Sequence, residues 1–199
     1  VSDARRGEVL LRIRAACRAG QQAYWVCPLV EPSERSERVS SRDKLELQNA
    51  LDAHAELKAE LPELSVGLVH GRMAPAEKAG VMREFLARRV QLLVATTVIE
   101  VGVDVPNASL MVIEHAERFG LSQLHQLRGR VGRGAVESVC ILLYRNPLSA
   151  AARARLKVIF ETADGFEVAR QDLLLRGPGE YLGERQSGMP LLRYADLER

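Results

Sequence analysis

Gln-Leu-His-Gln-Leu-Arg-Gly-Arg-Val-Gly-Arg, at residues 123–133, combines a helical pattern with closely spaced arginines. The spacing predicts a helix on which Gln126, Arg130 and Arg133 fall at i, i+4 and i+7 and form one polar stripe. The apolar stripe of the same helix consists of Leu124, Leu127 and Val131. We therefore expect this segment to pack its apolar stripe against a core and to leave the arginines available for a ligand.

Gly129 and Gly132 lie between the arginines of this segment. A glycine inside a helix costs about 1 kcal/mol relative to alanine, so two of them suggest that something comes close to this backbone. A surface helix with solvated arginines would explain the charge but not the glycines. We interpret the segment as an arginine clamp for an anion, with phosphate as the expected anion.

The composition is that of a soluble globular protein with one core and a small appendage. The 199 residues are 47% hydrophobic and 27% charged. The net charge is only +2, so a basic site for nucleic acid would have to be local. The sequence shows no signal peptide and no apolar run near about 18 residues, which predicts no membrane segment. Cys17, Cys27 and Cys140 are far apart in apolar surroundings, which predicts reduced thiols in a cytoplasmic protein.

Strand-like apolar runs alternate with helical patterns from residue 7 to residue 144. The expected strands are 23–30, 65–69, 91–95, 109–113 and 139–144. Such alternation predicts a parallel α/β sheet with right-handed crossovers. Functional groups are then expected at the carboxyl edge of the sheet.

His70, Gly71 and Arg72 follow the second expected strand. A glycine and an arginine after a strand end are common at phosphate contacts in open α/β sheets, but a plain strand-to-helix turn explains the glycine equally well. No Cys, His or carboxylate cluster accompanies His70 in the sequence, so we expect no metal site there.

A second motif lies at residues 95–106, Ala-Thr-Thr-Val-Ile-Glu-Val-Gly-Val-Asp-Val-Pro. The hydroxyls of Thr96 and Thr97 are placed where a strand ends and a helical turn begins, a favourable position for an oxyanion. Gly102 permits a tight turn, and Asp104 places a carboxylate after it. Capping of a helix and a turn would explain the same side chains, and both roles can hold at once.

Residues 149–162 and 166–175 read as two helices and predict a helical hairpin. Ser149 is the expected N-cap of the first helix. The side chains expected to face inward are Ala152, Leu156, Ile159 and Phe160. Residues 176–188 are rich in glycine and proline and predict a loop of defined shape.

The first motif resembles motif VI of superfamily 2 helicases and translocases, Q-x-x-G-R-x-x-R, at Gln126, Gly129, Arg130 and Arg133. The resemblance implies the second of two RecA-like, P-loop NTPase-type lobes. It also implies that Arg130 and Arg133 reach across a cleft to the γ-phosphate of ATP, beside Gln126 and Gly129. An arginine finger accelerates phosphoryl transfer by about 10³ to 10⁵ because it stabilises charge in the transition state.

Residues 95–106 resemble motif V of the same superfamily. The resemblance implies that Thr96 and Thr97 face the nucleic-acid backbone, whereas Gly102 and Asp104 face the nucleotide. Three further residues are assigned to the nucleic acid from their place at a strand end: His70, Gly71 and Arg72.

Residues 165–188 resemble the translocation motif shared by RecG and the bacterial transcription-repair coupling factor. The stretches that look like RecG are Arg176-Gly-Pro-Gly-Glu, Gln22-Ala-Tyr-Trp-Val-Cys-Pro-Leu and His70-Gly-Arg-Met. The resemblance implies that Arg155 and Arg176 brace each other in the hairpin and that Gln186 lies beside duplex DNA. Closure of a cleft around ATP would then move the hairpin and its loop against DNA.

The sequence has no G-x-x-x-x-G-K-[ST] loop and no Asp-Glu pair after an apolar strand. We therefore expect a fragment, with residues 1–148 as the second RecA-like lobe and residues 149–199 as the hairpin and translocation loop. ATP and Mg²⁺ would be held mainly by the missing first lobe, so this chain alone should not hydrolyse ATP.

The resemblances imply the C-terminal helicase lobe of a RecG-like ATP-dependent translocase, which remodels branched DNA and stalled forks in repair and recombination. The expected partners are branched or forked duplex DNA and the first lobe and wedge domain of the same polypeptide. Two alternatives stay open. One is the equivalent lobe of a transcription-repair coupling factor, and the other is a non-catalytic nucleic-acid-binding module, against which Arg130 and Arg133 argue.

Overall fold

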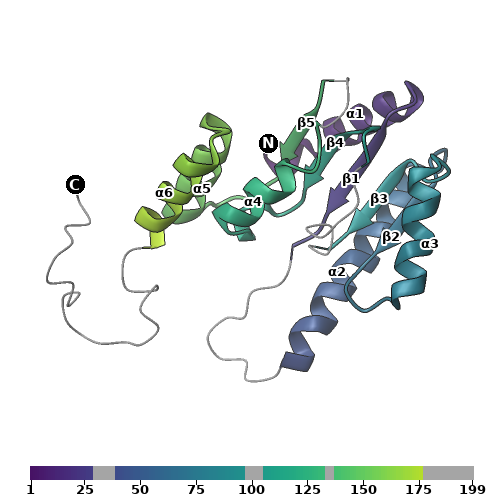
Figure 1. The fold of residues 1–199 in the computed structure, drawn as a ribbon, viewed down its shortest axis with the longest axis horizontal. Coiled ribbons are helices and arrows are strands. Elements are labelled where there is room, and N and C mark those ends of the chain that lie inside the picture. Colours follow the sequence, from purple (N-terminus) through teal and green to yellow (C-terminus); the bar gives the residue numbers. More distant parts are fainter. Residues whose placement is uncertain (29–38, 97–104, 133–136, 177–199) are drawn as a thin grey trace, which may run out of the picture.

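The core of the protein is a parallel β-sheet (Figure 1). The computed structural model describes residues 1–28, 39–96, 105–132 and 137–176, apart from the side chains of 39–46 and 176. Its strands are β1 (Gln22–Val26), β2 (Val66–Val69), β3 (Leu92–Ala95), β4 (Ala108–Ile113) and β5 (Val139–Leu142). Within these residues the strands run parallel in the order β2-β3-β1-β4-β5, so the predicted parallel sheet is confirmed.

Helices cover both faces of the sheet (Figure 1). They are α1 (Arg6–Arg18), α2 (Val39–Glu60), α3 (Pro75–Leu86), α4 (Leu121–Arg128), α5 (Ala150–Glu161) and α6 (Gly165–Arg176), with short 3-10 turns η1 (Asp3–Arg5) and η3 (Ala116–Arg118). Successive strand residues point to opposite faces. Trp25 therefore packs in the core that contains α1 and α2, whereas Tyr24 packs in the core that contains α3 and α4. The result is a three-layered α/β/α arrangement.

The segment that contains the first motif is helical over a shorter stretch than predicted. The helix α4 ends at Arg128, Gly129 is its C-cap, and the Arg130 N–H donates to the Leu127 carbonyl at 2.9 Å in the turn that follows. Gly132 has φ +94°, a left-handed conformation that glycine adopts without steric cost. The prediction of one continuous helix over 123–133 is therefore wrong, because the two glycines end it.

The apolar stripe of this segment behaves as predicted. Leu124 and Leu127 are fully buried, and Val131 packs against the same core from the turn. The predicted polar stripe does not form, since Arg130 lies beyond the helix that carries Gln126. Arg133 lies outside the described residues.

The helices α5 and α6 form the predicted hairpin beside α4 (Figure 1). Ser149 is the N-cap of α5, and its Oγ accepts a hydrogen bond from the Ala152 N–H at 3.1 Å. Ile159 of α5 and Val168 of α6 are buried in the core that contains α4. Phe160, predicted to face inward, is 87% exposed, and that prediction is wrong. The residue next to Ile159 lies about 100° further around the helix, away from the core.

The described helices include none that is both long enough and apolar enough to cross a membrane.

Candidate functional site

The carboxyl edge of the sheet brings two of the predicted motifs together. His70 follows β2 and Thr96 follows β3, and these two strands are neighbours. The Thr96 N–H donates to the Val69 carbonyl at 3.3 Å, so the two strand ends are joined directly. Thr96 is buried, while Thr97 lies outside the described residues. The expected clustering at this edge is confirmed for His70 and Thr96, and their contact with DNA stays a prediction.

The turn after β2 concentrates positive charge around His70. Lys78 of α3 donates through Nζ to the Gly71 carbonyl at 2.7 Å, and Arg72 is exposed. Burial, and then the charge of Lys78, lower the pKa of His70 against an opposing effect of Glu77, so the imidazole is neutral at pH 7. The His70 Nδ1 is buried and has no hydrogen-bond partner among the described residues. A neutral ring beside two cations is suited to a phosphate oxygen.

The end of α4 gathers the described residues of the predicted nucleotide site. The helix is fixed by three buried leucines, Leu121, Leu124 and Leu127. Gln126 and Gly129 are exposed, and the side chain of Arg130 is partly buried in the following turn. Arg130 directly follows Gly129 in the chain, and a guanidinium at this position could bind an anion. The other predicted residues, Gly102, Asp104 and Arg133, lie outside the described residues.

His125 and Arg128 occupy a side of α4 that faces the hairpin. The Arg128 Nη1 donates to the carbonyls of Ile159 at 2.8 Å and Thr162 at 2.7 Å, where α5 ends. The Arg128 Nη2 lies 3.2 Å from the His125 Nδ1. Sequence reasoning missed this contact. The acceptors are backbone atoms 31 and 34 positions further along the chain, and no local pattern signals them.

Arg155 joins the hairpin to the 3-10 turn η3. Its Nη2 donates to the Glu117 carbonyl at 2.9 Å. Its Nε is buried and has no hydrogen-bond partner among the described residues. The side chain of Arg176 lies outside the described residues, so the bracing pair that the sequence implies stays a prediction.

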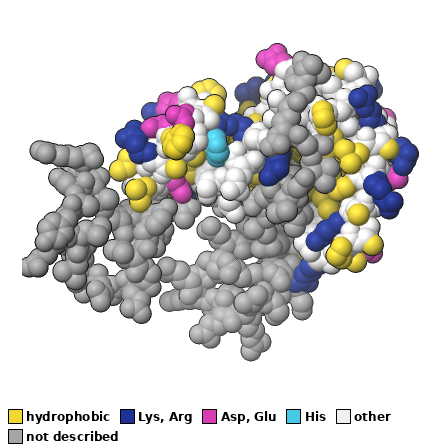
Figure 2. Space-filling model, in the orientation of Figure 1, with side chains coloured by type: hydrophobic (Ala, Val, Ile, Leu, Met, Phe, Trp, Pro, Cys, Tyr) yellow, Lys and Arg dark blue, Asp and Glu magenta, His cyan; other side chains and the backbone are white. Residues whose placement is uncertain are grey.

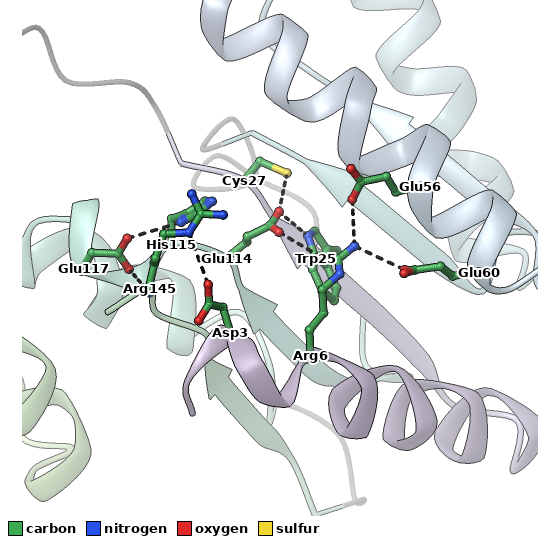
Figure 3. Close-up of polar contacts among 10 residues, drawn as sticks. All are labelled: Asp3, Arg6, Trp25, Cys27, Glu56, Glu60, Glu114, His115, Glu117 and Arg145. Carbon is green, nitrogen blue, oxygen red and sulfur yellow. Dashed lines mark hydrogen bonds and ion pairs between the residues drawn. The ribbon is translucent and has the colours of Figure 1, made fainter. Parts of the chain in front are cut away.

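A partly buried ion cluster fixes the ends of β1 and β4 (Figure 3). Glu114, directly after β4, accepts hydrogen bonds from Trp25 Nε1 at 2.9 Å and from Arg6 Nη1 at 3.0 Å. The Arg6 guanidinium also lies 4.8 Å from the centroid of the Trp25 ring and pairs with Glu56 at 3.2 Å and Glu60 at 3.4 Å. The cluster ties α1 and α2 to the sheet, and no sequence signal indicated it.

The described residues contain no group of three or more His, Cys, Asp or Glu side chains placed to hold a metal ion.

The three cysteines are free, as predicted. Burial raises the pKa of Cys17 to about 11 and that of Cys140 to about 12. Burial also raises the pKa of Cys27 well above its usual value, with Glu114 adding to the effect. Each thiol therefore stays protonated at pH 8, because its pKa lies well above that pH.

We expect these thiols to react slowly with Ellman's reagent in the folded protein. A thiol with a pKa near 11 carries about a hundred-fold or more less thiolate at pH 8 than a thiol at its usual pKa, and burial slows access further. The measurement is the labelling rate at pH 8, with the protein in guanidinium chloride as the control. Labelling of the folded protein at the rate of the unfolded one would contradict the prediction.

A profile of the family described as helicase conserved C-terminal domain matches residues 20–135. The chain belongs to the helicase C-terminal domain family. The matched residues include the strand ends at His70 and Thr96 and the whole of α4. The two regions built above from hydrogen bonds and charge therefore both lie inside the helicase domain.

Curated relatives extend the similarity to nearly the whole chain. It is 60% identical over 197 residues to the ATP-dependent DNA helicase RecG of Acidithiobacillus ferridurans, covering 99% of this chain and 28% of the relative. It is 58% identical over 200 residues to the ATP-dependent DNA helicase RecG of Escherichia coli strain K12, covering 100% of this chain and 28% of the relative. The chain thus spans little more than a quarter of the length of these relatives.

Solved structures support the same fold. A structure of RecG bound to a three-way DNA junction matches with 42% identity and a TM-score of 0.72, over 91% of this chain and 22% of that chain. The C-terminal domain of the DEAD-box protein Dbp5 matches with 18% identity and a TM-score of 0.53, over 88% of this chain and 92% of that chain. The expected RecA-like helicase lobe is confirmed by these matches.

Proposed function

We propose that this chain is the second motor lobe of a RecG-like ATP-dependent DNA helicase. The full-length protein would unwind and remodel branched DNA and stalled replication forks in repair and recombination. The observation that carries the proposal is the match, over 91% of the chain, to RecG bound to a three-way DNA junction. We place the protein in the cytoplasm, together with its DNA substrate.

The nucleotide would meet this lobe at the end of α4. Gln126 and Gly129 are exposed near this helix end, and Arg130, in the turn that follows, would act on the γ-phosphate as an arginine finger together with Arg133. Gly102 and Asp104 would contact the nucleotide from the motif V loop. ATP and Mg²⁺ would be held mainly by the first lobe of the same polypeptide, so the isolated chain should not hydrolyse ATP.

Duplex DNA would meet the carboxyl edge of the sheet. The neutral His70 and the cations Arg72 and Lys78 surround one turn there, beside the buried Thr96. Gly71 and Thr97 would approach the same backbone, and Gln186 of the translocation loop would contact the duplex. Phosphate contacts carry no base information, so we propose recognition of branched structure rather than of sequence.

The chain would consist of two functional units. Residues 1–148 would form the motor lobe, and residues 149–199 would form the hairpin and translocation loop. In the second unit, Arg155 and Arg176 would brace the hairpin, and the wedge domain of the same polypeptide would complete the junction site. The observed bond from Arg155 to the Glu117 carbonyl supports a hairpin that is held against the motor lobe.

The test is ATP hydrolysis and strand separation by the full-length protein on a three-way junction and on linear duplex DNA. We expect hydrolysis and unwinding that both depend on the junction. Release of stalled RNA polymerase without junction unwinding would instead favour a transcription-repair coupling factor. DNA binding without any hydrolysis would favour the non-catalytic module.

Replacing Arg72 or Lys78 by alanine in the full-length protein is expected to weaken junction binding by about 1 kcal/mol and to reduce the slope of log K against log salt by about 1. Arg72→Ala removes a cation from the turn after β2, and Lys78→Ala removes one from α3 that contacts the same turn. Figure 2 shows that Lys and Arg side chains are spread over one face of the protein. The measurement is junction affinity at several salt concentrations.

The matched control is Lys58→Ala. Lys58 is an exposed lysine near the end of α2, which packs on the face of the sheet opposite α3. Its salt slope should equal that of the unaltered protein. An unchanged slope for both Arg72→Ala and Lys78→Ala would remove this turn from the DNA interface.

A further inference from the structure

One side of α4 holds the end of α5 by charge-assisted hydrogen bonds. The last carbonyls of a helix have no intrahelical donors and carry the negative end of the helix dipole. The Arg128 Nη1 donates to two carbonyls there, those of Ile159 and Thr162. A guanidinium is well suited to this position because it offers several donors with fixed directions.

The same side of α4 also touches the start of α6. A Cβ added to Gly165, the first residue of α6, would lie 3.2 Å from the His125 Nε2 and 3.7 Å from its Cε1. The His125 ring therefore lies close against the connection between the two hairpin helices. Its Nδ1 meets the Arg128 Nη2 at 3.2 Å, so the two α4 side chains support each other. We call this set the α4–hairpin contact: His125 and Arg128 with Ile159, Thr162 and Gly165.

The α4–hairpin contact is close in sequence to the proposed arginine finger. Arg128 is the last residue of α4, and Arg130 follows it by two positions in the turn capped by Gly129. Two residues span at most about 7 Å of chain. When Arg130 moves toward or away from a nucleotide, the short chain between the two residues therefore moves Arg128 as well.

We propose that Arg128 is a positioning residue that couples the nucleotide site to the hairpin. The inference rests on the proposed function and deepens it, because it identifies the side chain that passes the movement of motif VI to the hairpin. His125 supports this role by holding the guanidinium from its other side. Arg128 does not itself touch the nucleotide in this proposal.

The experiment compares Arg128→Ala and Arg128→Lys with the unaltered full-length protein. Junction-stimulated ATP hydrolysis and the rate of junction unwinding are measured on the same samples, together with the midpoint of thermal unfolding. We expect Arg128→Ala to keep hydrolysis within about two-fold and to lower base pairs unwound per ATP by about ten-fold or more, because the nucleotide site stays complete while its link to the hairpin is lost. Arg128→Lys should be intermediate, since an ammonium can still donate to one carbonyl.

The matched control is Arg153→Ala, which removes an exposed arginine from α5 and should leave both rates unchanged. A purely structural role would lower hydrolysis and unwinding together with the unfolding midpoint, and that result would overturn the proposal. If Arg128→Ala does not fold, Arg128→Lys becomes the test. A normal number of base pairs unwound per ATP by Arg128→Lys would then overturn the proposal. An unaltered protein that neither hydrolyses ATP nor unwinds the junction would instead overturn the proposed function, and the inference with it.

Discussion

Replacing Arg130 by alanine in the full-length protein is expected to lower DNA-stimulated ATP hydrolysis by about 10³-fold or more, and to leave junction binding nearly unchanged. The guanidinium would stabilise charge that develops on the transferred phosphoryl group, so its loss acts on the transition state rather than on binding. The side chain is held, partly buried, in a turn fixed by the Arg130 N–H to Leu127 carbonyl bond and by the Gly129 cap. The measurement is kcat for ATP at saturating junction DNA.

Two variants make the Arg130 result specific. Arg130→Lys keeps the charge but loses the planar fork, so we expect it to recover little of the rate. Arg12→Ala removes an exposed arginine from α1 and should hydrolyse ATP normally. Normal turnover by Arg130→Ala, with its thermal midpoint unchanged, would exclude the finger role.

Replacing Glu114 by alanine is expected to destabilise the protein by about 2 kcal/mol, because the Trp25 N–H loses its acceptor and Arg6 keeps only its pairs with the more exposed Glu56 and Glu60. The cost should be large because Glu114 and Arg6 side chains are only 18% and 21% exposed. For a protein of this size the change corresponds to a fall of about 4–8 °C in the unfolding midpoint. The measurement is thermal unfolding followed by circular dichroism.

The control for Glu114 is another carboxylate that pairs with an arginine. Glu84 pairs with Arg89 on the surface, where the two side chains are 46% and 64% exposed. Exposed ion pairs contribute about 0–1 kcal/mol, so Glu84→Ala should unfold close to the unaltered protein. An equal fall in the unfolding midpoint for Glu114→Ala and Glu84→Ala would show that the cluster in Figure 3 does not stabilise the protein more than a surface ion pair.

Much of the fold followed from local signals. Alternating strand and helix patterns predicted the parallel sheet, and Ser149 predicted the start of α5. These predictions succeed because a strand period or a helix cap depends on residues a few positions apart. The grouping of His70 with Thr96 also followed, since parallel strands end at one edge of the sheet.

Two local predictions were wrong for reasons that are also local. The segment 123–133 was predicted as one helix from its side-chain spacing, but Gly129 and Gly132 end it after Arg128. Phe160 was predicted to face inward from its apolar character, yet its side chain is exposed. Apolar character indicates which side chains can be buried. The rotation of the helix against the core decides which of them are buried.

The sequence by itself determined the family motifs and the alternation of elements and predicted which residues would bind phosphate, because all of these depend on residue type and short spacing. Only the tertiary structure revealed that Arg128 binds the end of α5 and that Glu114 joins Arg6 to Trp25. The partners in these contacts are 31, 108 and 89 positions apart, in that order. Such pairs form when the sheet and its helices have packed, and their geometry is fixed by that packing rather than by any pattern along the chain.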